Sequence, residues 1–327
     1  MTEQLALKDT NVLKGIAILL MLIHHLFWVQ KGLFDDIRLF GLHYLVNEIG
    51  IISKVCVSIF VLLSGYGLTV VAEKNGGIGS LKSFYFHRFK KLFLNYWFVW
   101  VLFVPISIYV FGYTLADAYH GRVISHLLAD LSGIHSLIYE NDYCYNPTWW
   151  FYSCIILLYL FFPFLYRWAK RDVVSLLLMS IAASFLPIPQ LTVIKFYIVA
   201  FVIGMIMVVR MIPSPNNVIL PIVVFVVLIV VRNFNSYPLL IDTFISVALV
   251  QLYRSIKLHE WICVGLSFVG KHSMNIFLFH TFIFYFWFQD IVYASRNPII
   301  IFFTLLAICI LISMALELIK KYTIYKL

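Results

Sequence analysis

Long apolar runs recur along almost the whole length of this 327-residue chain. A run of about 17 to 25 apolar residues is long enough to cross a bilayer as an α-helix. By that criterion we expect ten membrane-spanning helices, at residues 12–30, 50–72, 92–112, 148–166, 173–188, 193–210, 218–232, 238–254, 273–289 and 298–319. The predicted fold class is therefore an all-α, polytopic membrane helix bundle with both termini on one side.

The composition agrees with a membrane protein and excludes an ordinary soluble domain. Hydrophobic residues make up 63% of the chain and charged residues only 12%, whereas about a quarter of the residues of a typical soluble domain are charged. The formal net charge of +9 does not indicate a nucleic-acid partner, because the basic residues lie between apolar runs and form no continuous patch. A basic excess between spans is typical of cytoplasmic loops.

Loop charge orients the predicted bundle. With a cytoplasmic N-terminus, the inner segments hold seventeen Lys and Arg residues and the outer segments hold five. The outer five are Lys31, Arg38, Arg122, Arg232 and Arg296. Because cytoplasmic loops are enriched in Lys and Arg, both termini are expected in the cytoplasm.

We expect a single integral membrane domain over residues 1–327, with no signal peptide. The first apolar run continues into FWVQKGLFDD, which lacks the small-residue pattern of a cleavage site and indicates a retained span. Residues 258–272 are amphipathic and too polar for a convincing span, so they are expected to lie along the inner surface or to re-enter the membrane. The five cysteines indicate neither a disulfide framework nor a metal site and are expected to be small packing residues.

The first span, residues 14–28 (KGIAILLMLIHHLFW), carries ionisable residues inside an apolar run. Lys14 and His25 are eleven residues apart, which places them on one face of a helix and about 16 Å apart along its axis. Ionisable groups are costly in hydrocarbon and usually mark a functional path, although a snorkelling lysine and an interfacial histidine pair would explain the same residues. His24 points about 100° away from His25 and is expected to pack or to hydrogen-bond within the bundle.

The longest outer loop, residues 113–147, carries acidic residues and histidines. They are Asp117, Asp130, Glu140, Asp142, His120, His126 and His135. Such a loop is either a surface for substrate contact or simply a solvated connection. His280 lies inside the ninth predicted span, where its cost in lipid makes it a second candidate for catalysis or acceptor binding.

Two further pairs allow alternative interpretations. Ser64 and Gly65 are expected to permit close approach of another helix rather than to supply a nucleophile, because small residues commonly do so in membranes. Trp149 and Trp150 could stack on a sugar ring. Tryptophans at a membrane interface form an aromatic belt, and we assign at least one of the two to it.

Five motifs, in order along the chain, resemble those of a known family. Residues 14–25 resemble a signature of a basic residue, ten spacers and a histidine, in which Lys14 replaces the usual arginine. Residues 57–68 (VSIFVLLSGYGL) resemble a second-helix stretch ending in Phe-x-x-x-Ser-Gly. In residues 87–91 (HRFKK), Arg88 matches the first arginine of Arg-x-x-Arg and Lys91 replaces the second.

The last two motifs lie in the second half of the chain. Residues 146–151 (NPTWWF) resemble the Trp-Phe opening of a later helix, and residues 273–280 (SMNIFLFH) resemble Ser-x-x-Ile-aromatic-Leu-x-His. Together the five motifs resemble those of the integral membrane acyltransferases of the acyltransferase 3 family.

The resemblance implies a membrane-embedded O-acyltransferase, most often an O-acetyltransferase of cell-surface glycans in a prokaryotic plasma membrane. Cytoplasmic acetyl-CoA would be the donor, and a polysaccharide or a lipid-linked sugar would be the acceptor. Lys14, Arg88 and Lys91 would bind the CoA phosphates near the inner surface, where the positive-inside bias alone also places cations. The two lysine replacements argue against a bidentate grip, because lysine binds phosphate as a point charge and arginine offers a planar fork.

The chemistry of acetyl transfer agrees with the same residues. Moving an acetyl group from a thioester to a sugar hydroxyl needs a base with a pKa near neutral, a stabiliser for the developing oxyanion, and cations for the CoA phosphates. His25 is the predicted catalytic base, acting directly on the acceptor hydroxyl rather than carrying the acyl group. His280 is the second catalytic candidate, and no metal is expected.

Two other functional classes compete with an acyltransferase. A transporter or flippase for a lipid-linked sugar or an acyl donor would use the buried histidines for proton coupling. We find no paired Gly/Pro-broken helices in corresponding halves of the chain, a pattern typical of such transporters. A structural or sensor protein would explain the topology but not the ordered motifs. The acceptor, the acyl chain and the oligomeric state are left open by the sequence.

Overall fold

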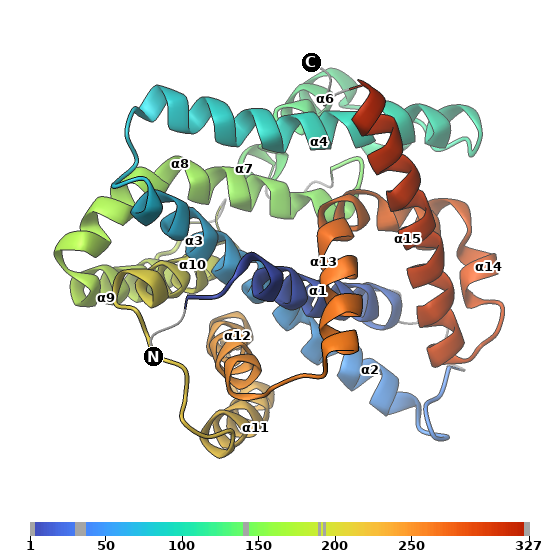
Figure 1. Cartoon of the computed structure of the whole chain (residues 1–327). Helices are drawn as coiled ribbons and strands as arrows, with labels where there is room; N and C mark the ends of the chain where they lie inside the picture. The colour runs from blue at the N-terminus through green and yellow to red at the C-terminus, as the bar shows by residue number, and fades with distance from the viewer. Residues whose placement is uncertain (1–3, 30–36, 140–143, 189–190, 192–193, 324–327) are drawn as a thin grey trace. The chain divides into compact units, whose positions relative to one another are not determined.

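The computed structural model describes residues 4–29, 37–139, 144–188, 191 and 194–323 (Figure 1). Several predicted features fall outside these residues: Lys31, Glu140, Asp142, Lys326, which is one of the seventeen predicted inner cations, and the ends of the spans at residues 12–30 and 193–210. Within the described residues the chain is helical and contains no strand, so the predicted all-α fold class is confirmed there.

Within the described residues, six helical segments are long and apolar enough to cross a membrane. They are Leu7–Trp28, Tyr44–Lys74, Leu81–Tyr109, Pro147–Arg171, Glu260–Trp287 and Pro298–Thr323. Shorter apolar helices lie at Val173–Ser184, Lys195–Val209 and Ile219–Asn233. The count of ten spans and the cytoplasmic termini stay predictions.

The chain divides into two compact units whose segments alternate along the sequence. Unit 1 comprises Met1–Leu20, Lys54–Tyr85 and Leu157–Lys271, and unit 2 comprises Met21–Ser53, Phe86–Ile156 and His272–Leu327. Helices α1 (Leu7–His24), α4 (Leu81–Tyr109), α8 (Trp150–Arg171) and α13 (Glu260–Thr281) each contribute residues to both units.

Unit 1 is built around α3 (Cys56–Lys74) and α10 (Ile194–Val209), which cross at a pair of glycines. A Cβ on Gly65 would overlap the carbonyl oxygen of Phe201, and a Cβ on Gly204 would overlap that of Leu62. Glycine at these two positions therefore allows backbone-to-backbone contact, as small residues do in membrane helices. The prediction that Gly65 permits close helix approach is confirmed.

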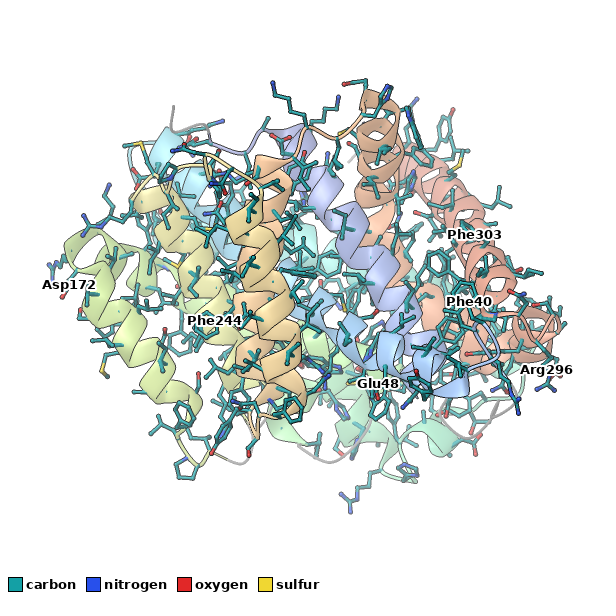
Figure 2. All side chains as sticks on the ribbon, turned by 90° about the horizontal axis from the view of Figure 1, so that it is seen from below. Phe40, Glu48, Asp172, Phe244, Arg296 and Phe303 are labelled. Carbon is teal, nitrogen blue, oxygen red and sulfur yellow. The ribbon has the colours of Figure 1, made fainter. Side chains whose placement is uncertain are left out.

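The other helices of unit 1 pack around this crossing. Helix α9 (Val173–Ser184) contacts α10, and α12 (Pro238–Ser255) contacts α3, α10 and α11 (Ile219–Asn233). Helices α11 and α12 lie side by side (Figure 1). Asp172, labelled in Figure 2, caps the start of α9, because its Oδ1 accepts from the backbone N–H groups of Val174 and Ser175.

In the part of unit 2 that the structure describes, there are several short helices, two of which are π-helices. They are η1 (His25–Val29), α2 (His43–Ile52), η2 (Ser53–Val55), α5 (Leu115–Ala118), α6 (Val123–Leu131), α7 (His135–Ile138), η3 (Pro147–Trp149), η5 (Phe282–Trp287) and α14 (Gln289–Tyr293), of which η2 lies at the boundary with unit 1. The long helix α15 (Pro298–Thr323) ends the described chain. Its outward face is apolar, as Phe303 in Figure 2 illustrates with 59% of its surface exposed. Such a face suits contact with lipid.

The structure corrects one predicted boundary and extends another helix beyond its predicted span. Residues 258–272 were expected on the inner surface or in a re-entrant segment, but residues from Glu260 onward belong to the continuous helix α13. Helix α4 begins at Leu81, before the predicted membrane span at residues 92–112, and it includes the basic residues 87–91 that precede this span. Both helices extend into polar sequence, where apolar composition alone no longer indicates where a helix begins.

Candidate functional site

Two histidines from distant parts of the sequence meet in unit 2. The Nδ1 atom of His25 lies 2.8 Å from Nε2 of His280. The rings are stacked, with centroids 4.8 Å apart. His280 is fully buried. Both catalytic candidates are therefore in direct hydrogen-bond contact, which no spacing between residues 25 and 280 could have indicated.

The partners of His280 decide which ring nitrogens carry protons. Its Nδ1 lies 3.0 Å from the carbonyl oxygens of Ile276 and of Phe277. Because a carbonyl oxygen only accepts, Nδ1 must be the N–H donor, and Nε2 of the neutral ring is then an acceptor. His25 must in turn donate from Nδ1, so the basic lone pair of a neutral His25 lies on its Nε2.

Both histidines lie at changes of helix type. His25 is the first residue of the π-helix η1, and His280 lies two residues before the π-helix η5. Phe284 of η5 stacks on both imidazoles, with ring centroids 6.5 Å from His25 and 5.8 Å from His280. Single-turn π segments are frequent at functional sites, and here they bring three rings into one stack.

Hydroxyl groups lie beside the histidine pair. Thr281 Oγ1 is 3.5 Å from Nε2 of His280 and 3.4 Å from Oγ1 of Thr148. Thr148 Oγ1 also lies 2.8 Å from Asn146 Oδ1, to which it donates. The NPTWWF motif is thereby joined to the end of α13 that carries His280.

Trp149 belongs to the packing of this region. Its Nε1 donates to the carbonyl oxygen of Leu278 at 2.9 Å, and only 1% of the residue is exposed. Its ring packs against Tyr96 and Phe282. Neither the sugar-stacking nor the aromatic-belt interpretation fits Trp149, because a buried indole faces neither a sugar nor the interface. Trp149 instead hydrogen-bonds to a carbonyl of α13.

His24 occupies a separate environment from His25. It is 7% exposed, and its Nδ1 donates to the carbonyl oxygen of Gly50 at 2.7 Å. The prediction that His24 hydrogen-bonds within the bundle is confirmed. The two neighbouring histidines of the first span thus have different partners.

The three predicted phosphate-binding residues lie on two helices. Lys14 is half-buried on the part of α1 that belongs to unit 1. Arg88 is half-buried and Lys91 exposed, and they are three residues apart on α4, within unit 2. Residues at this spacing share a helix face, so Arg88 and Lys91 together present two cations. Their role in binding an acyl donor stays a prediction.

The loop at residues 113–147 contains folded structure that the sequence did not indicate. Asp130 is only 1% exposed. Its Oδ2 accepts from the Tyr119 hydroxyl at 2.8 Å and from the backbone N–H of Tyr145 at 2.9 Å, and its Oδ1 accepts from the Tyr96 hydroxyl at 3.2 Å. Burial raises the pKa of Asp130 to about 6, against the lowering effect of these donors.

Two histidines of the same loop are also buried and in contact with each other. His126 Nδ1 lies 3.0 Å from His135 Nε2, and both rings are buried. Asp117 is exposed and forms a reciprocal cap with Thr114 at the start of α5, which lowers the pKa of Asp117. The interpretation of this loop as a merely solvated connection is therefore wrong for Asp130, His126 and His135.

The cysteines agree with the packing interpretation. All five are free thiols, and four of them are buried. Of these, only Cys144 lies in the loop at residues 113–147, where burial raises the pKa of its thiol well above the ordinary value. A thiol in this state is a poor nucleophile.

A comparison with family models identifies one match. The acyltransferase 3 model, described as an acyltransferase domain, matches residues 7–318. No curated protein and no solved structure was found to be similar to the chain. The family match includes every residue of the histidine pair and of the basic set described above.

Proposed function

Because the chain belongs to the acyltransferase 3 family and is a multi-pass membrane protein with acyltransferase chemistry, we propose that it is an O-acetyltransferase of the cell envelope. It takes the acetyl group from cytoplasmic acetyl-CoA. The acceptor is a hydroxyl group of a cell-surface polysaccharide or a lipid-linked sugar, and the location is a prokaryotic plasma membrane. The single observation that carries the proposal is the hydrogen bond between His25 and His280.

The proposed reaction starts at Nε2 of His25. This nitrogen takes the proton of the acceptor hydroxyl while the hydroxyl oxygen attacks the thioester carbonyl carbon. The tetrahedral intermediate then collapses: the C–S bond breaks, the sugar ester forms, and the CoA thiolate takes the proton back from His25. No net proton is gained or lost by the protein.

The proposed role of His280 is to orient and stabilise His25. A histidine base works best when its other ring nitrogen is held by an acceptor, because that bond fixes the tautomer and stabilises the imidazolium that forms. The acceptor here is a neutral imidazole nitrogen instead of a carboxylate. Two carbonyl oxygens hold His280 in the required tautomer, as described above.

The proposed donor contacts are electrostatic. Arg88 and Lys91, and Lys14 on α1, carry the positive charge that the CoA phosphates require. Their predicted inner location would let the CoA nucleotide stay in the cytoplasm. The acetylated end of CoA would then extend toward the histidine pair.

Mass analysis of surface polysaccharide tests the proposal. Cells with the wild-type gene, a deletion, and His25→Ala at equal expression level are compared for acetyl groups per sugar. Loss of the acetyl increment in both mutants supports the acetyltransferase. An unchanged acetyl pattern in the deletion, with altered polymer export, would replace it with a transporter. His24→Gln is the matched control, because Gln keeps an N–H donor for Gly50 and leaves His25 in place.

A further inference from the structure

A buried lysine near the end of the chain lies at the centre of a polar network in unit 2. Lys320 of α15 is 1% exposed. Its Nζ donates to Asn95 Oδ1 at 2.7 Å, to Asn275 Oδ1 at 2.5 Å and to Glu317 Oε1 at 3.3 Å. A lysine ammonium has three protons, and these three acceptors use all of them.

The surrounding groups fix the orientation of the two amides. Asn275 Nδ2 donates to Ser313 Oγ at 3.0 Å and to Glu317 Oε1 at 2.8 Å. Asn95 Nδ2 donates to the carbonyl oxygen of Lys91 at 2.9 Å. Both amide oxygens are therefore directed at Lys320. A fully satisfied polar network of this kind rigidifies its surroundings.

The network connects three helices at functionally informative positions. Asn95 lies on α4, four residues after Lys91 and seven after Arg88, so all three residues share one face of that helix. Asn275 lies on α13, five residues before His280. Helices α13 and α15 lie side by side (Figure 1). Asn275 of α13 donates to Ser313 and to Glu317 of α15.

An ordinary positive-inside role does not explain this lysine. A cation that only orients a membrane protein needs no buried partners and is normally solvated or directed to the interface. Breaking a buried charge network costs more than losing an exposed one, because the remaining polar groups lose their partners. Here the buried network joins the helix that carries Arg88 and Lys91 to the helix that carries His280.

We propose that Lys320 is a positioning residue that holds the basic end of α4 in register with α13, so that the donor phosphates and the histidine pair are correctly spaced. This inference rests on the proposed acetyl transfer. Lys320 does not touch the reacting atoms in this account. It acts through Asn95 on donor binding and through Asn275 on the placement of His280.

Steady-state kinetics on the full-length purified protein test both halves of the inference. Asn95→Leu should raise KM for acetyl-CoA about tenfold and change kcat less than threefold, because only the α4 side is released. Asn275→Leu should lower kcat roughly 10- to 100-fold with little change in KM, since small displacements of a catalytic group have effects of this size. Lys320→Met should show both changes.

A pair of variants that exchanges an amide and a carboxylate distinguishes lost positioning from misfolding. Asn275→Asp places two carboxylates beside Lys320 and should lower kcat. Adding Glu317→Gln should restore kcat to within about threefold of wild type, because the Gln amide can donate to Asp and Asp can accept from Lys320. The amount of folded protein and the Tm are measured for every variant.

The outcomes separate this inference from the proposed function. Wild-type protein without any acetyl transfer overturns both. Active wild type with a Lys320→Met variant of equal kcat and KM overturns the positioning role alone. The role is also overturned if all three single variants lose activity only in proportion to lost folded protein, at unchanged KM, since that is the result of a purely structural network.

Discussion

The α3–α10 crossing and the His25–His280 contact are two solutions to the same problem, which is how helices hold each other where water is scarce. At the crossing, Gly65 and Gly204 remove side chains so that backbones touch. At the histidine contact, two polar rings hydrogen-bond to each other, and His280 also donates to backbone carbonyls. The first arrangement is sensitive to added volume and the second to changed chemistry.

The largest effect is expected at the crossing. Gly65→Ala should remove most folded protein from the membrane, because its Cβ meets the Phe201 carbonyl and overpacking against a backbone costs about 3 kcal/mol or more. Detergent-solubilised yield and Tm measure this. Gly67→Ala on the same helix is the control, since a Cβ at this position would meet no atom of another helix within 4 Å. Equal yield and Tm of the two variants would refute the close packing of α3 against α10 at Gly65.

The segment of unit 2 at residues 113–147 should respond to pH through Asp130. Its pKa is raised to about 6 from 3.8, so the folded state binds the proton more tightly than the unfolded state. Stability should therefore be highest near pH 4 and fall as pH rises to 6, by up to about 3 kcal/mol, and then stay level.

Asp130→Asn is the test of that pH dependence. The amide oxygen can accept from Tyr145 N–H and the Tyr119 hydroxyl, so the variant should fold. The step in Tm between pH 4 and 6 should shrink relative to wild type. A step of unchanged size would assign the pH dependence to another group.

The histidine contact should be chemically strict and structurally tolerant. His280→Phe keeps an aromatic ring in the stack but removes the acceptor of His25, so kcat should fall roughly 100-fold, which corresponds to about 2.7 kcal/mol. Tm should change far less than in Gly65→Ala. A variant with wild-type kcat would show that His280 does not orient the base.

The smallest effect is expected at an exposed ion pair of unit 1. Lys8 and Glu260 approach at 2.5 Å, but their side chains are 47% and 75% exposed. Exposed pairs of this kind contribute little, because water screens them. Lys8→Ala should leave Tm and activity unchanged. A clear loss of Tm or activity would show that this exposed ion pair contributes to stability or function.

The sequence was most informative where one physical property dominates. Helices follow from apolar runs, and the approach at Gly65 follows from the absence of a side chain, so both could be predicted. The five motifs also led to the correct family. In each case the signal is contained in neighbouring residues or in their order.

Contacts between distant residues could not be predicted in the same way. The pairing of His25 with His280 and the burial of Lys320 depend on which helices meet, which a single sequence does not contain. Lys320 is one of the seventeen predicted inner cations, and its fully buried position distinguishes it from an exposed one such as Lys91. The burial of Asp130 could not be predicted, because a loop carboxylate is ordinarily solvated.

The most direct test of the account is acetyl transfer by purified protein in liposomes, with acetyl-labelled CoA and surface polysaccharide as acceptor. Wild type and His25→Ala are compared at equal amounts of folded protein. We predict label in the polysaccharide with wild type and a loss of at least about 100-fold with His25→Ala, the usual contribution of a general base. Transfer by His25→Ala at the wild-type rate would contradict the central role of the histidine pair.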